Sequence, residues 1–474
     1  MRPQHSMSRR LFLRQALAAG ALYGCGGLPG LASVARASFA PATQPILADL
    51  TLTGGPDFRH LLPPPYSSTP GSYGYEYWRA RARSHGLGYV PAEWQARWAD
   101  AYFPCEGSGQ QFGMLRGASW LYDEWRAGHV AIISNAYGGT SRDHEHCTLV
   151  LDQGNLDSGP NHAGRSGWGG RLAEACDANV VALSRSPRPF CYASTDGNIN
   201  LASDHNLINA GDTRNLSLFH PEVSESSRWS SRARTARALR SYYTGRSIDM
   251  LDVSPARRMI DLEQKVRVFG QAFDDRLATL PVPELLARQY SGDTPVLYNR
   301  DFGLQLRNLH DSLACNDLLS MRVASLEYGG WDTHSEQSAN IDPRLRDLFM
   351  RDRGISALHQ VLPADVRSRL VWVIAGEFGR QLSDNGDGGT DHGLGNCVLV
   401  IGESVRGGVY GNMFPQAEIS RLQTDYSPHI DGLTAFDHVF GRVADYIQPG
   451  AGSVVFPKRA SRPLEAGVNL SAMF

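Results

Sequence analysis

The sequence has no excess of positive charge, no set of long apolar runs and no C-x-x-C pair. Its 474 residues carry a formal net charge of −2, whereas nucleic-acid-binding proteins usually show a clear basic excess. Only one stretch, near the start, approaches the length of a membrane span, which excludes a multi-pass membrane protein. Without C-x-x-C, a zinc ribbon or a thioredoxin-like redox motif has no support. No internal repeat is found.

The composition is that of a folded protein, with 42% hydrophobic and 20% charged residues. Such a chain can bury a core, which excludes a mostly disordered protein. We expect a single α/β domain over residues 38–474, with irregular insertions near 58–100 and 200–250. Residues 224–246 are rich in Ser and Arg, which predicts a solvated helix or an inserted segment, with an anion-binding surface as the alternative.

The first 37 residues have the pattern of an export signal. Arg9 and Arg10 precede Leu11-Phe12-Leu13, a weakly apolar run reaches Val34, and Ala35-Arg36-Ala37 forms an A-x-A cleavage site. This order is typical of a twin-arginine signal peptide. It predicts the twin-arginine export machinery as a partner, a periplasmic or extracellular location, and no transmembrane segment in the mature chain. A membrane anchor behind a chance Arg pair and lipidation at Cys25 are the alternatives.

Cleavage after Ala37 leaves six cysteines in the mature chain. An even number in an exported protein permits up to three disulfides. Free buried cysteines are the alternative, and the sequence does not choose between them.

Short apolar runs alternate with helical patterns along the chain. Strands are predicted at 46–52, 130–134, 179–183, 321–326, 370–375 and 397–401, and helices at 112–127, 302–319 and 345–362. Such alternation favours an α/β fold with a mostly parallel central sheet and helices on both faces. Ligands of such sheets bind beyond the carboxyl ends of the strands.

Polar residues that could bind a metal follow four of the predicted strands. They are Asp57, the segment from Ser141 to His146, Asp332 with His334, and Glu377. Acidic residues are common in loops, but the repeated placement predicts one shared site. Asp332 and His334 can face a single cation, because residues i and i+2 of an extended segment point to the same side. Carboxylate and imidazole together suit zinc, manganese or iron, and a hydrogen-bonded loop pair is the alternative.

The segment after residue 375 contains further candidates. Glu377 is followed by Arg380, which could clamp an anionic substrate group or form an ion pair with Glu377. Asp391 and His392 end a Gly-rich stretch just before the 397–401 run. They add two ligand types, although Asp391 could instead cap a turn.

The loop before residue 147 supplies candidates for catalysis. Ser141 could act as a nucleophile, and Asp143 or His144 could transfer protons. The alternative is a polar loop with an N-cap Ser that leads into a helix from about Cys147.

Several motifs together resemble the domain-of-unknown-function 1501 family of exported bacterial proteins. They are the twin-arginine leader, Gly-Gly-Pro-Asp57, Ser141-Arg142-x-His144, Gly-Gly-Trp-Asp332-Thr-His334-x-x-Gln337, Glu377-Phe-Gly-Arg380 and Asn385-Gly-x-x-Gly-Thr-Asp391-His392-Gly. This family is distantly similar to alkaline phosphatases and sulfatases, which place two metal ions at the carboxyl ends of strands.

The resemblance implies roles for individual residues. It places Asp57 on one metal, Asp332 and His334 on the other, and His392 as a late histidine ligand. Glu377 stands where the superfamily usually has an Asp-His pair, but Phe378 follows it, so one imidazole is missing. Asp143 stands where the family commonly has Ser. These departures leave a single-metal site, an altered reaction or an inactive descendant as alternatives.

The sequence hypothesis is therefore an alkaline-phosphatase/sulfatase-like fold and an exported, metal-dependent hydrolase of phosphate or sulfate esters. The expected cofactor is a divalent metal, either zinc, manganese or calcium, and the expected substrate is a small anionic ester. The candidate metal ligands are Asp57, Asp332, His334, Glu377, Asp391 and His392, and the candidate catalytic residues are Ser141, Asp143, His144 and Arg380. The alternative is a non-catalytic exported protein that binds a metal or a partner.

Overall fold

The computed structural model describes residues 43–139, 141–215 and 272–474. The leader and residues 216–250 of the expected second insertion lie outside these ranges. The chain divides into two compact units, one of residues 1–40, 212–282 and 311–320 and one of residues 41–211, 283–310 and 321–474. The expectation of a single domain over 38–474 stays a prediction.

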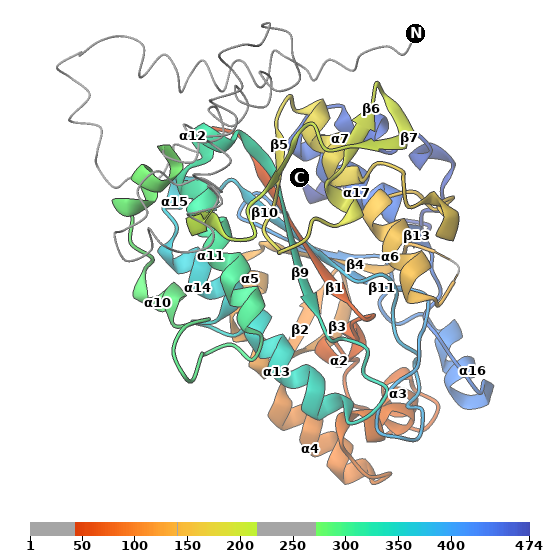
Figure 1. Ribbon diagram of the computed structural model, residues 1–474. Coiled ribbons are helices and arrows are strands. Elements are labelled where there is room, and N and C mark those ends of the chain that lie inside the picture. Colours follow the sequence, from red (N-terminus) through yellow and green to blue (C-terminus); the bar gives the residue numbers. More distant parts are fainter. Residues whose placement is uncertain (1–42, 140, 216–271) are drawn as a thin grey trace, which may run out of the picture. The chain divides into compact units, whose positions relative to one another are not determined.

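The larger unit is built on a nine-stranded sheet (Figure 1). The order is β12-β4-β11-β10-β1-β9-β5-β8, with β13 also paired to β4. The strands are β1 (Ile46–Thr53), β4 (Val130–Tyr137), β5 (Asn179–Ala182), β8 (Leu207–Asn209), β9 (Met321–Gly329), β10 (Leu370–Ala375), β11 (Asn396–Ile401), β12 (Gly408–Tyr410) and β13 (Thr434–Ala435). Each predicted strand is present, and the expected mixed α/β fold with a mostly parallel sheet is confirmed.

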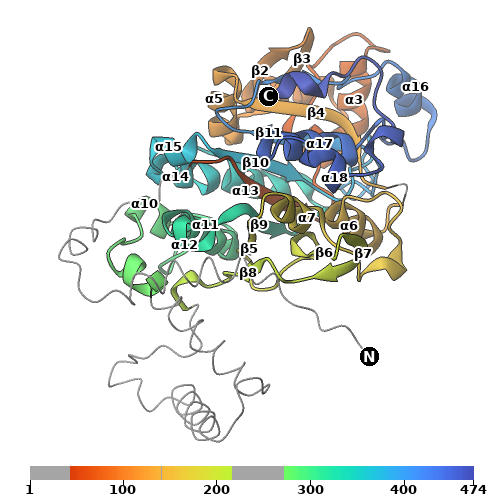
Figure 2. The same ribbon diagram turned by 90° about the horizontal axis from the view of Figure 1, so that it is seen from above.

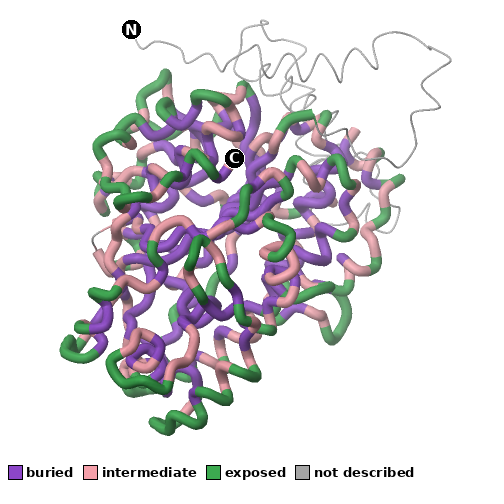
Figure 3. The backbone as a smooth tube through the Cα atoms, turned by 180° about the vertical axis from the view of Figure 1, so that it is seen from behind, coloured by how far each residue is buried: buried purple, intermediate pink, exposed green. Residues whose placement is uncertain are grey.

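The central strands are buried on both faces, and successive residues of a strand contact helices on opposite faces of the sheet. Leu47, Val371 and Val373 pack with α7 (Trp168–Ala175), α17 (Phe436–Ile447) and α18 (Ala451–Val455) on one face. On the other face, Trp372 donates a hydrogen bond to His359 of α14 (Gly354–Val361). Figures 1 and 2 show these two helix layers, and Figure 3 shows the buried strands between them. Nearly continuous apolar strands are typical of such a covered sheet.

The strand directions bring the candidate residues to one edge of the sheet. β1, β9 and β10 are parallel, while β11 is antiparallel to both of its neighbours, β10 and β4. The carboxyl ends of β1, β4, β9 and β10 therefore share an edge with the start of β11. The segments containing residues 144, 332–334, 377 and 392 all leave or enter the sheet there.

The segment from 58 to 100, expected to be an irregular insertion, contains several helices joined by irregular stretches. It contains α2 (Phe58–Leu61), α3 (Tyr73–Arg81), η2 (Arg83–His85) and α4 (Pro91–Ala101). Ser72 caps α3 by accepting from the Tyr75 amide, and Pro91 begins α4. Caps of this kind are local helix signals, although the Pro-rich run before them suggested a loop.

The predicted helix at 112–127 is correct only in its second half. Residues Gln110–Leu115 form β3, which pairs with β2 (Tyr102–Gly107), and the helix α5 covers Ser119–Ala127. Ser108 and Gly109 both have positive φ angles, of 51° and 72°. Two such residues form the turn that matches the twist of a hairpin, so the chain folds back where helical spacing was expected.

Two other predicted helices are each split. The 345–362 segment contains α13 (Gln337–Phe349) and α14, separated by a turn in which Asp352 has φ of 61°, and the 302–319 segment contains α11 (Arg300–Ala314) and α12 (Asn316–Leu319). The other elements are η3 (Arg116–Ala118), α6 (His144–Gln153), η4 (Pro160–His162), η5 (Pro189–Cys191), β6 (Ala193–Thr195), β7 (Asn198–Ser203), η6 (Thr213–Asn215), α10 (Glu284–Ala287), α15 (Ala364–Arg367), α16 (Ala417–Thr424), η7 (Arg459–Ser461) and η8 (Leu470–Met473).

Across the described residues, none of the helices combines the length and the apolar character needed to cross a membrane. Cys105, Cys147, Cys176, Cys191, Cys315 and Cys397 are all free thiols.

In the smaller unit, Asp311 is the buried anchor of the described residues. Its carboxylate accepts hydrogen bonds from the Thr213 hydroxyl and from the Arg214 guanidinium. These bonds fix the start of η6 to residues that are distant in sequence.

Candidate metal centre

Three imidazole rings meet one carboxylate at the shared edge of the sheet. The Nε2 atoms of His334 and His392 lie 3.0 and 3.1 Å from Oδ1 of Asp332. The Nε2 atom of His144 lies 3.4 Å from Oδ2 of the same residue. His144, Asp332 and His392 form a group whose ligand atoms all lie within 4.8 Å of one another. We call the four residues the histidine cluster.

Each imidazole of the cluster is held from behind through its Nδ1 atom. The three contacts, each 2.8 Å long, join His144 to the Glu377 carboxylate, His334 to the Asp391 carboxylate and His392 to the Arg142 carbonyl. All three partners are hydrogen-bond acceptors, so the proton of each ring belongs on Nδ1. The lone pairs of all three Nε2 atoms therefore face the centre of the cluster.

This arrangement fits a bound cation. The Nε2 atoms of His334 and His392 are only 3.0 Å apart, and two lone pairs at this distance repel each other. The Nε2 atom of His144 is buried and has no hydrogen-bond partner among the described residues. A cation at the centre would satisfy all of these atoms at once, and histidines braced by carboxylates or carbonyls are typical of metal sites.

Glycines allow the loops of the cluster to approach closely. Gly54, which follows β1, has φ of +117°, and a Cβ atom there would lie 2.4 Å from the Asp332 amide nitrogen. A Cβ atom on Gly389 would lie 2.1 Å from the carbonyl carbon of His334. Both contacts are shorter than van der Waals packing allows, so larger residues would push the ligand loops apart.

Arg380 braces the cluster from inside the protein. Its guanidinium donates to the carbonyls of Gly54, Gly55, Trp331 and Thr390 and, at 2.5 Å, to Oδ1 of Asp332. The Arg380 side chain is fully buried. Its donors are committed to the loops, so the predicted substrate clamp does not fit this geometry. The expected ion pair with Glu377 is replaced by one with Asp332.

The electrostatic environment keeps the central carboxylate ionised. Burial alone would raise the pKa of Asp332, but the hydrogen bond and charge of Arg380, together with His392 and His334, lower the pKa to about 2. The hydrogen bond to Glu377 is the largest influence on His144 and raises its pKa. The cluster thus has a permanent anion at its centre.

Two predicted metal ligands lie behind the histidines. Glu377 is buried, and its Oε1 accepts from the His144 ring and from the Gly54 amide, while Oε2 has no partner among the described residues. Asp391 accepts from His334 and Asn385 through Oδ1. The structure therefore assigns both carboxylates to orienting imidazoles. It also places His144, predicted as a proton carrier, among the ligand-forming residues.

Asp57 lies outside the histidine cluster, contrary to its predicted role as a ligand. Its carboxylate accepts from both terminal nitrogens of Arg81, at 2.5 and 2.9 Å, and from Gln337 at 2.7 Å. It also caps α2 by accepting from the His60 amide. Burial is the largest single influence and would raise the pKa of Asp57, but the charge and hydrogen bonds of Arg81, together with His60 and Gln337, lower the pKa overall. A carboxylate with this many partners has no oxygen free for a cation.

Gln337 connects Asp57 to the loops of the cluster. Its Oε1 atom accepts from the hydroxyls of Thr333 and Thr390. Each of these threonines precedes a cluster residue or its brace, so Asp57 and Gln337 position the two loops indirectly. The motif containing Gln337 was visible in the sequence, but nothing there distinguished a ligand from a brace.

Ser141 and Asp143 form the start of α6. The Asp143 amide donates to Ser141 Oγ at 3.0 Å, and Asp143 Oδ1 accepts from the His146 amide as the N-cap of the helix. The alternative of a capped loop leading into a helix is confirmed, but the N-cap is Asp143 rather than a serine, and the helix begins at His144 rather than near Cys147. Neither side chain has a hydrogen bond to the cluster among the described residues.

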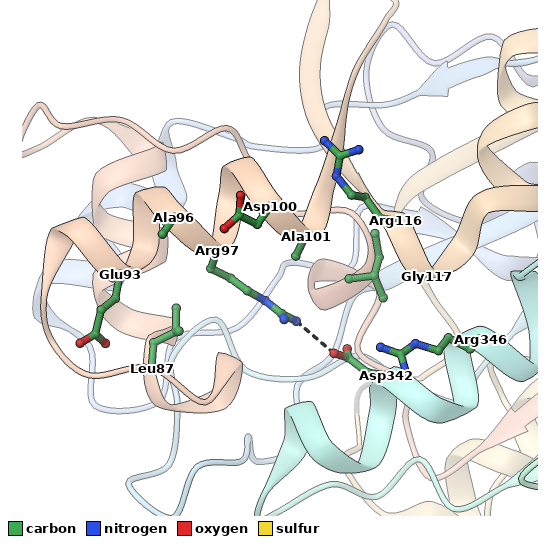
Figure 4. A pocket seen from close by; sticks show the side chains of 11 residues that line it. Leu87, Glu93, Ala96, Arg97, Asp100, Ala101, Arg116, Gly117, Asp342 and Arg346 are labelled. Carbon is green, nitrogen blue, oxygen red and sulfur yellow. Dashed lines mark hydrogen bonds and ion pairs between the residues drawn. The ribbon is translucent and has the colours of Figure 1, made fainter.

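A separate depression of about 560 Å³ lies between α4, η3 and α13. Figure 4 shows that its charged lining residues include the ion pair of Arg97 and Asp342. None of the cluster residues lines it.

The comparisons with known proteins bear on part of the chain. No curated protein matches it. Residues 317–427, which include Asp332, His334 and His392, match the family described as a protein of unknown function, DUF1501, and this match confirms the resemblance inferred from the motifs.

Proposed function

We propose that the protein is an exported, metal-dependent hydrolase of anionic esters, with phosphate or sulfate esters as substrates. The cation would be held by His144, His334, His392 and Asp332. The reaction class comes from the resemblance of the motifs to the alkaline phosphatase and sulfatase superfamily. Because a fold does not by itself determine a reaction, the metal site is inferred from the geometry of the cluster.

The observation that carries the proposal is the direction of the three imidazoles. Each ring has its Nδ1 atom at 2.8 Å from an acceptor and its Nε2 atom turned towards Asp332. Three nitrogens and one carboxylate form a donor set that suits zinc, with manganese or iron as alternatives. Calcium prefers six to eight oxygen ligands, so the set argues against the calcium expected as one possibility.

A divalent cation in the cluster would polarise an ester oxygen and lower the pKa of an attacking hydroxyl or water. The residues around it have supporting tasks. Glu377 and Asp391 fix the imidazole rings, and Arg380 fixes Asp332. The Ser141 hydroxyl accepts a hydrogen bond from the Asp143 amide, so its own O–H group is not used in that bond. Ser141 therefore stays our candidate nucleophile, with water as the alternative.

One observation favours a second function, a non-catalytic metal-binding protein. Ser141 and Asp143 are both engaged in the turn that starts α6. A helix cap explains these residue types without any catalysis. Ester hydrolysis therefore has less support than metal binding.

The decisive experiment measures metal content and hydrolysis in the same protein. We expect about one divalent ion per chain in wild-type protein, and much less in Asp332→Ala, His334→Ala and His392→Ala, because each removes a donor atom. His205→Ala is the matched control, since His205 is exposed and, in the part of the chain that the structure describes, its side chain hydrogen-bonds to Ser203 and not to the cluster. Each protein is tested with aryl phosphates, diesters and sulfates.

The possible results separate the two functions. Metal with hydrolysis that Ser141→Ala abolishes supports the hydrolase with a serine nucleophile. Metal without turnover on the whole ester panel supports the binding protein. Wild-type protein that binds no divalent ion refutes both.

Export is the part of the proposal that rests on the sequence alone. Arg9 and Arg10 stand before a weakly apolar run, as the twin-arginine machinery requires. Lys at both positions should trap the precursor in the cytoplasm, and a mature N-terminus at Ser38 would exclude lipidation at Cys25.

A further inference from the structure

We propose that Arg142 and His429 form the group that recognises the oxyanion of the substrate, at the rim of the histidine cluster. This inference rests on the proposed function and names the part of the site that selects an anionic ester. Arg142 contacts both the histidine cluster and His429. Its carbonyl oxygen accepts from His392 at 2.8 Å, and its guanidinium lies 3.0 Å from Nδ1 of His429.

The contact between Arg142 and His429 leaves hydrogen-bond donors free. A guanidinium can only donate, so Nδ1 of His429 must accept and its proton belongs on Nε2. The same Nδ1 atom also lies 3.4 Å from the Ser427 carbonyl, a contact that would need the proton on Nδ1. The contact with Arg142 is shorter, so we place the proton on Nε2. Among the described residues, no carboxylate lies within ion-pair distance of Arg142, and Nε2 of His429 has no partner.

The backbone keeps His429 near the cluster. Arg380 pairs with His392 on one side, and the next residue, Gln381, pairs with His429 on the other. Neighbouring strands lie about 4.8 Å apart, so the backbones of His392 and His429 are separated by roughly 10 Å. That is within the reach of an arginine side chain, and it places the free donors beside the proposed cation rather than among its ligands.

The charges of the site favour an anionic ligand. Among the cluster, its braces and Arg142, the carboxylates of Asp332, Glu377 and Asp391 oppose the guanidinium groups of Arg380 and Arg142, which leaves one negative charge on these groups. A divalent cation would change this balance to one positive charge, and a positive cleft attracts anions. Arg380 cannot provide the contact, because its donors are bound to loop carbonyls and to Asp332.

A guanidinium with free donors matches the geometry of a tetrahedral oxyanion. It can donate two parallel hydrogen bonds to two oxygens of a phosphate or sulfate. The Nε2–H group of His429 can donate to a third oxygen. We therefore infer that the substrate presents a terminal phosphate or sulfate group to this pair.

The test measures how tightly zinc-loaded protein binds inorganic phosphate, by titration calorimetry. We expect Arg142→Ala to weaken phosphate binding about 10–100-fold, which is the range for a hydrogen bond to a charged group. Arg142→Lys should recover only part of this loss, because an ammonium lacks the planar fork. His429→Ala should weaken binding less. Arg185→Ala removes the same charge from an exposed site that pairs with Asp301, and it should bind phosphate like wild type.

Zinc content is the second measurement. It should not change in Arg142→Ala, because His392 is held by the backbone carbonyl of residue 142 and not by its side chain. Arg142→Ala that binds phosphate as tightly as wild type would overturn the inference, as would zinc-loaded wild type that binds no phosphate. If Arg142→Ala does not fold, His429→Ala decides in the same way. Wild-type protein that binds no zinc refutes the proposed function instead, and phosphate titration of that protein still compares wild type with Arg142→Ala.

Discussion

At the scale of single residues, the site depends on side chains that hold the four cluster residues in place. Glu377 holds His144, Asp391 holds His334, and Arg380 holds Asp332. The two carboxylates fix the ring orientation and raise the basicity of the imidazoles, whereas Arg380 fixes Asp332 and keeps it ionised. Glu377 and Asp391 are residue types that also bind metals. The sequence could therefore identify the residues of the site but could not separate the ligands from the residues that hold them.

Glu377 provides a direct test of this bracing. Glu377→Gln keeps an oxygen that can accept from the His144 ring and the Gly54 amide, which are both 2.8 Å away. Glu377→Ala removes that oxygen. We expect metal affinity to fall about 10–100-fold in Glu377→Ala and clearly less in Glu377→Gln. Zinc titration against a competing chelator measures both, and equal losses would mean that the charge of Glu377, or direct ligation by it, matters more than its hydrogen bond.

Asp152 lies outside the cluster, and its buried carboxylate should make the stability of the fold depend on pH. It lies on α6, Arg188 donates to its Oδ1 at 2.9 Å, and its Oδ2 has no partner among the described residues. Burial is the largest influence and raises the pKa from 3.8 to about 6. Between these values the folded protein holds a proton that the unfolded chain releases, so the free energy of unfolding falls as pH rises through this range.

Asp152→Asn cannot titrate, so it should not share this loss. From pH 4 to pH 7, the difference in unfolding free energy should shift in favour of the variant by on the order of 1–3 kcal/mol. Urea unfolding at several pH values measures the difference. Parallel curves for the two proteins would contradict the raised pKa.

At the scale of elements, the crossing of the loops around Gly389 controls the distance between the histidines. Gly389→Ala would place a Cβ atom 2.1 Å from the His334 carbonyl carbon, whereas Gly164 has nothing within 4 Å of the same position. We expect Gly389→Ala to lower both metal affinity and thermal stability, by about 1–3 kcal/mol for the latter, as overpacking does. Gly164→Ala should change neither. Metal analysis and thermal unfolding of the two variants form a matched comparison.

The sequence predicted elements well where hydrophobicity was continuous. The run at 370–375 coincides with β10, and the run at 46–52 with β1. It failed where two patterns overlap. Phe112 and Leu115 are three residues apart, like residues on one face of a helix, yet they belong to a hairpin because the chain turns back at Ser108 and Gly109. The Ser72 cap of α3 and the Pro91 start of α4 were missed, because the Pro-rich run before them suggested a loop.

The same limit applies to the site. A strand followed by an acidic residue placed Asp332 and Glu377 at the correct edge of the sheet. It also placed Asp57 there, but Arg81, 24 residues further on, occupies that carboxylate. Partners that arrive from a separate helix leave no local mark in the sequence. The contact of the Arg142 carbonyl with His392 is equally invisible, because it involves the backbone.

At the scale of the whole molecule, stability should be independent of disulfides. All six described cysteines are free, and five of them are buried. Burial is the largest influence on Cys147 and Cys315 and raises the pKa of each to about 12, which keeps them as unreactive thiols. We expect the mature protein, unfolded without reductant, to yield six thiols in a colorimetric assay, and its melting temperature to be the same with and without reductant. Fewer thiols would reveal a disulfide.

The cluster joins parts of the chain that are far apart along it. His144 and its brace Glu377 are separated by 233 residues, and Arg142 and His392 by 250. An ion held there would cross-link these segments and close loops longer than those that most disulfides close. Such loop closure reduces the entropy of the unfolded chain. An ion present at 100 times its dissociation constant would add about 2.7 kcal/mol to the free energy of unfolding. For a chain whose described cysteines are free thiols, a chelator would then destabilise the fold in the way that a reductant destabilises a disulfide-linked protein.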